Sequence, residues 1–223
     1  MKNKLIFIIP FSIILTILCG ASLNKKNTSI ITTAYIPVNN GFTLVYQSSF
    51  GESVTNYFQN GEFTISSSES DKFKYKQTME IKDNGVYVTE TYQYLKIFLF
   101  IKKEATFTYN KPLLRFPLPL KPGVTWGWQG KEYSDGNTTE VTVSGKAICR
   151  ESVITKAGTF DAIKIESVIE SSSNSKNTVT EWYAENIGLI KAKIIIEGGG
   201  LMGTLRDFLG YGTIEFELKE IKQ

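Results

Sequence analysis

The sequence contains no histidine and only two cysteines, Cys19 and Cys149. Without histidine, the chain cannot build a Ser-His-Asp or Cys-His nucleophile, or a histidine-ligated zinc or iron site. Two cysteines are too few for a cysteine-rich metal site. We therefore expect neither a metal nor a cofactor, and a carboxylate pair is the one acid–base set left to an enzyme of this sequence.

An excess of charge of one sign is also lacking, because 25 basic residues stand against 22 acidic ones. Two of the basic residues, Lys2 and Lys4, lie in an N-terminal segment that we expect to be removed. A near-neutral domain has no basic surface for phosphates, which excludes nucleic acid as a partner. The apolar content of 42% is sufficient for a folded core.

The N-terminus is typical of an export signal. Lys2 and Lys4 precede an apolar run from Leu5 to Leu18 that is shorter than a membrane-spanning helix requires. We expect a signal peptide at 1–21, a flexible tether at 22–34 and a single β-domain at 35–223. The predicted location is the periplasm or cell envelope.

Cys19 stands at the end of the apolar run, where a bacterial lipoprotein carries its lipidated cysteine. Lipidation at Cys19 would attach the protein to a membrane, whereas cleavage after Ala21 would remove this cysteine, and both alternatives stay open. In either case only Cys149 remains in the folded domain, so no internal disulfide can form. Its alternation with polar neighbours favours a buried core cysteine over a reactive thiol.

From Thr43 onward the hydrophobic pattern has a period of two, which predicts β-strands. Turn signals separate the strands at 83–85, 135–137, 157–158 and 186–188. Many short strands with regular turns indicate an all-β fold. We expect an antiparallel curved sheet or a half-open barrel.

Two segments depart from this pattern. Ile97–Ile101 is apolar on both faces, which predicts a strand covered on both sides or a strand in contact with an apolar ligand. Leu201, Leu205, Phe208 and Leu209 share one face of a helix between glycines. This spacing predicts a short amphipathic helix near the C-terminus, either a plug for the open end of the sheet or a flap over an apolar cavity.

The chain contains an internal similarity. The segments 37–47 and 119–129 share a proline, a glycine, a threonine, an aromatic residue and a glutamine at equal spacing. Val88–Tyr92 is similar to Val179–Tyr183 in the same order along the chain. We interpret this as a duplication with repeats at 35–116 and 117–223.

Three segments resemble a known group of proteins. Residues 116–126, 157–165 and 181–191 are similar to motifs of uncharacterised exported bacterial β-domains. Some members of that group look like the lipoprotein-carrier superfamily, in which a half-open antiparallel barrel encloses an apolar cavity. The resemblance implies a similar fold and brings no catalytic set with it.

Two non-enzymatic functions follow. The first is a structural or protein-interaction domain of the cell envelope, in which Trp126, Trp128 and Tyr133 would meet a partner, with both tryptophans on one strand face. The second is a carrier for a lipid or another apolar ligand. The candidate ligand-binding residues of the carrier are Trp126, Trp128, Leu201, Leu205 and Phe208.

An enzyme is the weakest alternative. Glu181 with Glu185, or Asp161 with Glu166, would have to serve a carboxylate-dependent glycan hydrolase. The turn at Asn186 argues that the strand ends before Glu185 can share a face with Glu181. We therefore assign no catalytic residue and expect a protein that is not an enzyme.

Overall fold

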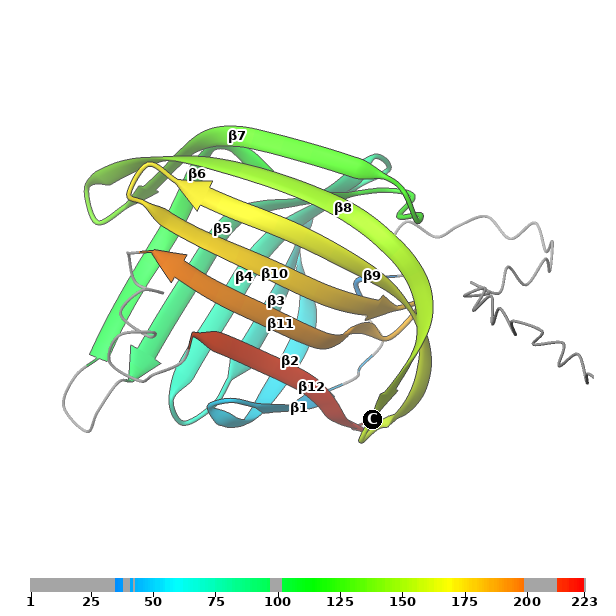
Figure 1. Cartoon of the computed structure of the whole chain (residues 1–223). Coiled ribbons are helices and arrows are strands. Elements are labelled where there is room, and N and C mark those ends of the chain that lie inside the picture. Colours follow the sequence, from blue (N-terminus) through cyan, green and yellow to red (C-terminus); the bar gives the residue numbers. More distant parts are fainter. Residues whose placement is uncertain (1–34, 38–40, 42, 97–101, 199–211, 223) are drawn as a thin grey trace, which may run out of the picture.

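A computed structural model describes residues 35–37, 41, 43–96, 102–198 and 212–222. Twelve antiparallel strands form a closed barrel in which each strand pairs with its neighbours in the chain and β12 pairs with β1 (Figure 1). The strands are β1 (Thr43–Ser48), β2 (Gly51–Asn60), β3 (Phe63–Glu69), β4 (Phe73–Lys82), β5 (Gly85–Lys96), β6 (Lys102–Pro117), β7 (Thr125–Ser134), β8 (Asn137–Thr155), β9 (Gly158–Ser171), β10 (Ser175–Ala184), β11 (Gly188–Gly198) and β12 (Thr213–Lys222).

Closure of the barrel corrects the expected curved sheet or half-open barrel. The ring closes because β1 pairs with β12 from Thr43 opposite Lys222 to Ser48 opposite Phe216. Alternation correctly predicted the all-β antiparallel class, but it says nothing about whether the last strand reaches the first. The described part of the chain contains no helix, so the helical component of the expected fold finds no support. The expected helix around Leu201–Leu209 and the apolar segment 97–101 lie outside the described residues.

The turn predictions are confirmed. Asp83 and Asn84 connect β4 to β5, and the hairpin between β7 and β8 places Asp135 and Gly136 at φ angles of 49° and 76°. Two successive positive φ angles match the twist of a two-residue hairpin. At the turn from β10 to β11, Asn186 has a φ of 63° and Gly188 one of 96°, so two residues of the predicted turn are in the left-handed region.

The two ends of the barrel differ. We call the end where β1 begins and β12 ends the packed end. In Figure 1 this end is on the right, and one looks through a near wall of β8–β12 to a far wall of β2–β6. The β8–β9 hairpin curls over the packed end, where the amide of Ala157 donates to the carbonyl of Leu218.

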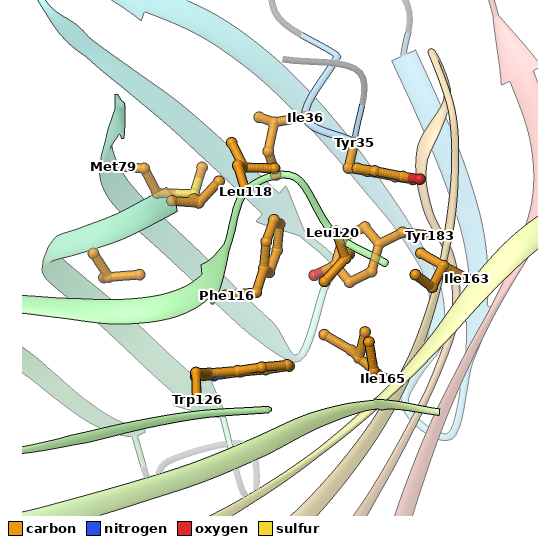
Figure 2. Close-up of a cluster of buried hydrophobic side chains, with 13 residues drawn as sticks. Tyr35, Ile36, Met79, Phe116, Leu118, Leu120, Trp126, Ile163, Ile165 and Tyr183 are labelled. Atoms are coloured by element: carbon orange, nitrogen blue, oxygen red, sulfur yellow. The ribbon is translucent and has the colours of Figure 1, made fainter. Parts of the chain in front are cut away.

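The core fills the packed end in two clusters. The first is drawn in Figure 2 and contains Tyr35, Ile36, Met79, Val86, Val88, Phe116, Leu118, Leu120, Trp126, Ala147, Ile163, Ile165 and Tyr183. The second contains Leu44, Tyr46, Val153, Ala162, Ala184, Ile190 and Leu218. Residues before β1 and in the β6–β7 connection contribute to the first cluster, so segments outside the strands also help to close this end.

The outer surface of the barrel carries cross-strand ion pairs. Lys74 lies 3.2 Å from Glu69, and Lys176 lies 3.7 Å from Glu170. Lys219 pairs with Glu52. Such exposed pairs add little stability each, and they place charged groups on the outer surface.

The two sequence similarities behind the predicted duplication fall on strands that correspond in one case and differ in the other. The shared motif leads into β1 and β7, which are the first strands of two six-strand halves. The second similarity falls in β5 and β10, which hold different places in the halves and run in opposite directions. The duplication and the domain boundaries stay predictions.

Candidate functional site in the barrel interior

Arg115 reaches the barrel interior through a β-bulge in β6. Val86 of β5 lies opposite Phe116, whereas the next residue, Tyr87, lies opposite Leu114. Arg115 is therefore the extra residue on its strand. Because a bulge re-aims a side chain relative to the regular alternation, both Phe116 and Arg115 can point inward.

The Arg115 guanidinium bridges the interior from wall to wall, and we call this arrangement the Arg115 brace. Its Nη2 lies 2.7 Å from Glu181 Oε1 on β10 and donates to the Tyr183 hydroxyl at 2.7 Å. Its Nη1 donates to Gln77 Oε1 on β4. Three strands that are not neighbours in the barrel thus meet through one side chain.

The Arg115 brace is electrically balanced. Burial alone would lower the pKa of the Arg115 guanidinium, but the Glu181 carboxylate and the Tyr183 and Tyr75 hydroxyls outweigh burial and hold this pKa well above its usual range. Burial is also the largest reason why the pKa of Tyr183 lies well above its ordinary value. We therefore expect the guanidinium to remain charged and the phenol to remain neutral at physiological pH.

Inward-facing side chains differ on the two sides of the Arg115 brace. Toward the packed end they are fully buried, with Met79 of β4 and Val88 of β5 at 1% exposure and Ile165 of β9 at 0%. On the other side, the inward residues of the same three strands, Tyr75, Gln93 and Ile169, are only partly buried. In each of these three strands, the inward side chain on the packed side of the brace is thus the more deeply buried one.

We call the part of the interior with these partly exposed side chains the middle zone. It is bordered by the inward side chains Tyr75, Gln93, Phe107, Ile169, Val179 and Ile194, all of which are partly exposed. Beyond the middle zone, a third cluster of Phe50, Phe73, Leu95, Ile196 and Ile214 packs across the opposite end. An eight-stranded barrel is just filled by its side chains, so twelve strands leave space unless large residues occupy it.

Trp126 and Trp128 lie along the inner wall, each over a glycine. A Cβ on Gly145 would stand 2.2 Å from the Trp126 ring, and one on Gly130 would stand 2.5 Å from the Trp128 ring. The predicted shared face of the two tryptophans is confirmed, and both are buried. Because the glycines let the rings lie close to the wall, the indoles take up less of the interior.

Several interior polar groups have no hydrogen-bond partner within the described structure. They are the Ser53 hydroxyl, the Trp126 indole nitrogen, the Ser134 hydroxyl and the Asn177 side-chain oxygen. Buried polar groups are normally paired with protein or with ordered water. Glu132, on the inward face of β7, has its pKa raised by burial. The interior therefore contains buried polar groups as well as apolar side chains.

The structure places the predicted partner and ligand residues as follows. Trp126 and Trp128 lie inside the barrel and are not available to a protein partner, whereas Tyr133 on the outer face is 40% exposed. Leu201, Leu205 and Phe208 lie outside the described residues, and so does Cys19.

The candidate carboxylates are not brought together as catalytic pairs. Glu181 is buried in the Arg115 brace, whereas Glu185 lies beyond the end of β10 and pairs with Arg150 at the packed end. Asp161 pairs with the same arginine at 3.1 Å, and Glu166 is exposed in β9. Each of these carboxylates therefore has an ordinary structural or surface environment. Among the described residues, no acidic or cysteine cluster is suited to a metal ion.

Cys149 is not the expected core cysteine. A bulge in β8 places Cys149 opposite Lys164, whose ammonium group stacks over the Trp182 ring at 5.3 Å on the outer face. The Cys149 side chain is partly exposed, and its sulfur lies 3.7 Å from Glu151 Oε2. Alternation failed here because the bulge shifts the register by one residue.

Sequence reasoning missed Arg115 and Gln77. The available signal was a single arginine between Leu114 and Phe116 in an otherwise apolar stretch. A buried arginine requires partners, but its partners come from strands far apart in the chain, so no local pattern identifies them.

Comparisons with known proteins identify one matching family and three solved structures of low similarity to this chain. A protein from Parabacteroides distasonis that is provisionally described as a lipoprotein aligns with a TM-score of 0.44 and 14% identity. The alignment covers 84% of this chain and 98% of the other chain. An exported protein with a YmcC-like fold from Bacteroides fragilis, also provisionally described, has a TM-score of 0.44 and 16% identity over 85% and 99% of the two chains. The hypothetical lipoprotein YmcC of Escherichia coli has a TM-score of 0.43 and 10% identity over 80% and 83%.

No curated protein sequence matches this chain. The family described as DUF3108-like matches residues 24–205, which is well over half of the sequence. That range includes all three segments that carry the resemblance to uncharacterised exported β-domains. The chain belongs to the DUF3108-like family.

Proposed function

We propose that this chain is an exported, non-enzymatic binding protein that holds an amphiphilic ligand in the middle zone of its barrel. The observation that carries the proposal is the change in burial along single strands. On β9, inward Ile165 is fully buried and inward Ile169 is partly exposed. Because Ile169 is on the inner wall of a closed barrel, its partial exposure supports the proposal that a ligand has room beside it.

The lining of the middle zone suggests the chemistry of the ligand. The wall of β3–β5 presents hydroxyl and amide groups, from Ser66, Ser68 and Gln93 among others. The facing wall presents aliphatic groups, with Ile169, Val179 and Ile194 on β9, β10 and β11. A lipid-like molecule with an apolar chain and an uncharged polar part fits both walls, and the balanced Arg115 brace adds no net charge.

Export is supported by the N-terminal sequence, where Lys2 and Lys4 precede the apolar run. Attachment to a membrane through a lipid on Cys19 stays a prediction. The absence of catalysis is proposed because Glu181 is engaged by Arg115, and Asp161 and Glu185 by Arg150. A general acid–base pair would need carboxylates free to exchange protons with a substrate.

The test uses cis-parinaric acid, a fluorescent fatty acid, in titrations of the full-length protein. Val179→Phe places a ring in the middle zone, whereas Thr180→Phe places the same ring on the outer face of the same strand. We expect saturable binding to wild type and to Thr180→Phe, and at least about tenfold weaker binding to Val179→Phe, which corresponds to about 1.4 kcal/mol. Equal affinity of all three proteins, or no saturable binding to any, would refute the proposal.

A protein-interaction domain is the second candidate, and one observation favours it. Ile154, near the tip of the β8–β9 hairpin, is 77% exposed. An isolated exposed apolar residue is common on protein surfaces. The interaction function gains support only if the interior binds no apolar ligand.

A further inference from the structure

Among the described strand pairs, the backbone ladder between β6 and β7 is the shortest, and we call this junction the seam. On one side, β6 pairs with β5 from Gly85 opposite Pro117 to Lys96 opposite Lys102. On the other side, β7 pairs with β8 over its full length. Between β6 and β7, the described residues form only two pairs, Thr108 with Tyr133 and Tyr109 with Glu132.

The sequence of β6 explains why the pairing stops. Pro112 has no amide hydrogen to donate. The register of β6 against β5 jumps from Leu113 to Thr108 across one residue of β5, so the strand bulges at this point. Bulges and prolines both interrupt a ladder of backbone hydrogen bonds.

Side chains replace part of the missing ladder. The amide of Lys131 donates to the Asn110 side-chain oxygen at 2.8 Å. The indole nitrogen of Trp128 donates to the Pro112 carbonyl at 3.0 Å. Separation of β6 from β7 would therefore break a two-residue ladder, these two contacts and the contacts of the Trp128 ring with Lys111 and Tyr109. Separation at the other strand pairs would break longer backbone ladders.

The seam lies between a surface groove and the middle zone. Outside, a groove of about 240 Å³ is lined by Tyr92, Glu104, Ala105, Thr106 and Asp135. Inside, the Tyr109 and Trp128 rings meet edge to face at 5.9 Å. Ala105 lies opposite Gln93 in the register, on the inward face of the wall, and it also lines the groove.

Within the described residues, side-chain clusters stand at both ends of the barrel. The first cluster fills the packed end, and the third cluster joins Phe73 of β4 to Phe216 of β12 at 5.8 Å across the opposite end. We propose that the β6–β7 seam is the portal through which an apolar-chain ligand enters and leaves the middle zone. This inference rests on the proposed function.

The first test locks the seam with a disulfide. Thr108→Cys and Tyr133→Cys are introduced at opposed positions, with Cys19→Ser and Cys149→Ser so that no other thiol remains. The matched control carries Glu166→Cys and Thr180→Cys, which are opposed on the fully paired strands β9 and β10. Mass spectrometry verifies each disulfide, and stopped-flow fluorescence follows the association of cis-parinaric acid.

We expect oxidation of the seam variant to slow association by about tenfold or more, because a portal limits exchange. Reduction with dithiothreitol should restore the wild-type rate, and oxidation of the control should not change it. An oxidised seam variant that binds as fast as its reduced form would overturn the portal while the proposed function stands. Absence of binding in both the wild type and the reduced variants would instead overturn the proposed function, and the portal with it.

A second variant tests the portal without a disulfide. Asn110→Ala removes the acceptor for the Lys131 amide at the outside of the seam. We expect association and dissociation both to become several times faster while the equilibrium affinity stays nearly the same, since a portal is not a binding group. Unchanged rates would contradict the role of this contact in holding the seam closed.

Discussion

Ile165 and Ile169 stand on the same strand, face the same way and are the same residue type, yet their surroundings differ. Ile165 is fully buried in the first cluster, and Ile169 is partly exposed beyond the Arg115 brace. The strand and its alternation are continuous between them. The difference therefore comes from what the opposite walls contribute, and it shows that side chains near the packed end are more deeply buried than those of the middle zone.

The largest expected effect comes from removing the Arg115 brace that separates the two regions. Arg115→Met leaves the Glu181 carboxylate buried without its cation, so we expect a loss of about 3 to 5 kcal/mol in the free energy of unfolding, measured with urea. The double variant Arg115→Met with Glu181→Leu should recover most of this loss, because no isolated charge remains. Arg150→Met, at the more exposed arginine of the packed end, should cost within about 1 kcal/mol.

A loss in Arg115→Met no greater than that in Arg150→Met would mean that the brace does not couple the three walls. The difference between the packed end and the middle zone would then come from side-chain packing alone.

The isoleucine pair sharpens the comparison directly. Ile165→Ala creates a cavity in the packed region and should cost about 2 to 5 kcal/mol. Ile169→Ala removes a side chain that is already partly exposed, and we expect less than half of that loss in the same urea titration. Equal losses at the two positions would show that the middle zone is packed as tightly as the end.

The smallest expected effect concerns the wall beneath Trp126. A methyl group on Gly145 would collide with the indole, so Gly145→Ala should cost about 1 to 3 kcal/mol and push the ring into the interior. Gly127→Ala, whose new Cβ would stand 3.7 Å from the Val143 carbonyl oxygen, should be neutral or stabilising by about 0.4 to 1 kcal/mol. Urea unfolding followed by tryptophan emission compares the two variants, and equal stability would contradict the close approach of ring and wall.

The sequence contained enough information for the strands and turns. Turn residues such as Asn84 and Asp135 act locally, and alternation along β4 or β10 is visible in a few residues. The face shared by Trp126 and Trp128 was predictable for the same reason. The inward direction of both tryptophans was not predictable, because only the closed barrel defines which face of the strand is inside.

Closure, the Arg115 brace and the seam could not be predicted from local patterns. Closure joins residues from both ends of the described chain, Thr43 and Lys222. The brace depends on a one-residue bulge that turns Arg115 inward toward partners on β4 and β10. Cys149 was misplaced by the same kind of bulge, since a single register shift reverses the meaning of alternation.

The central claim is that the middle zone holds a ligand, and native mass spectrometry tests it most directly. The full chain is expressed with its N-terminal segment, and the wild-type protein and Val179→Phe are analysed as purified from the cell envelope. We predict a bound mass of lipid size on the wild type that is lost on denaturation and is absent from Val179→Phe. A bare polypeptide for both proteins, unchanged after incubation with membrane lipid extract, would contradict the account.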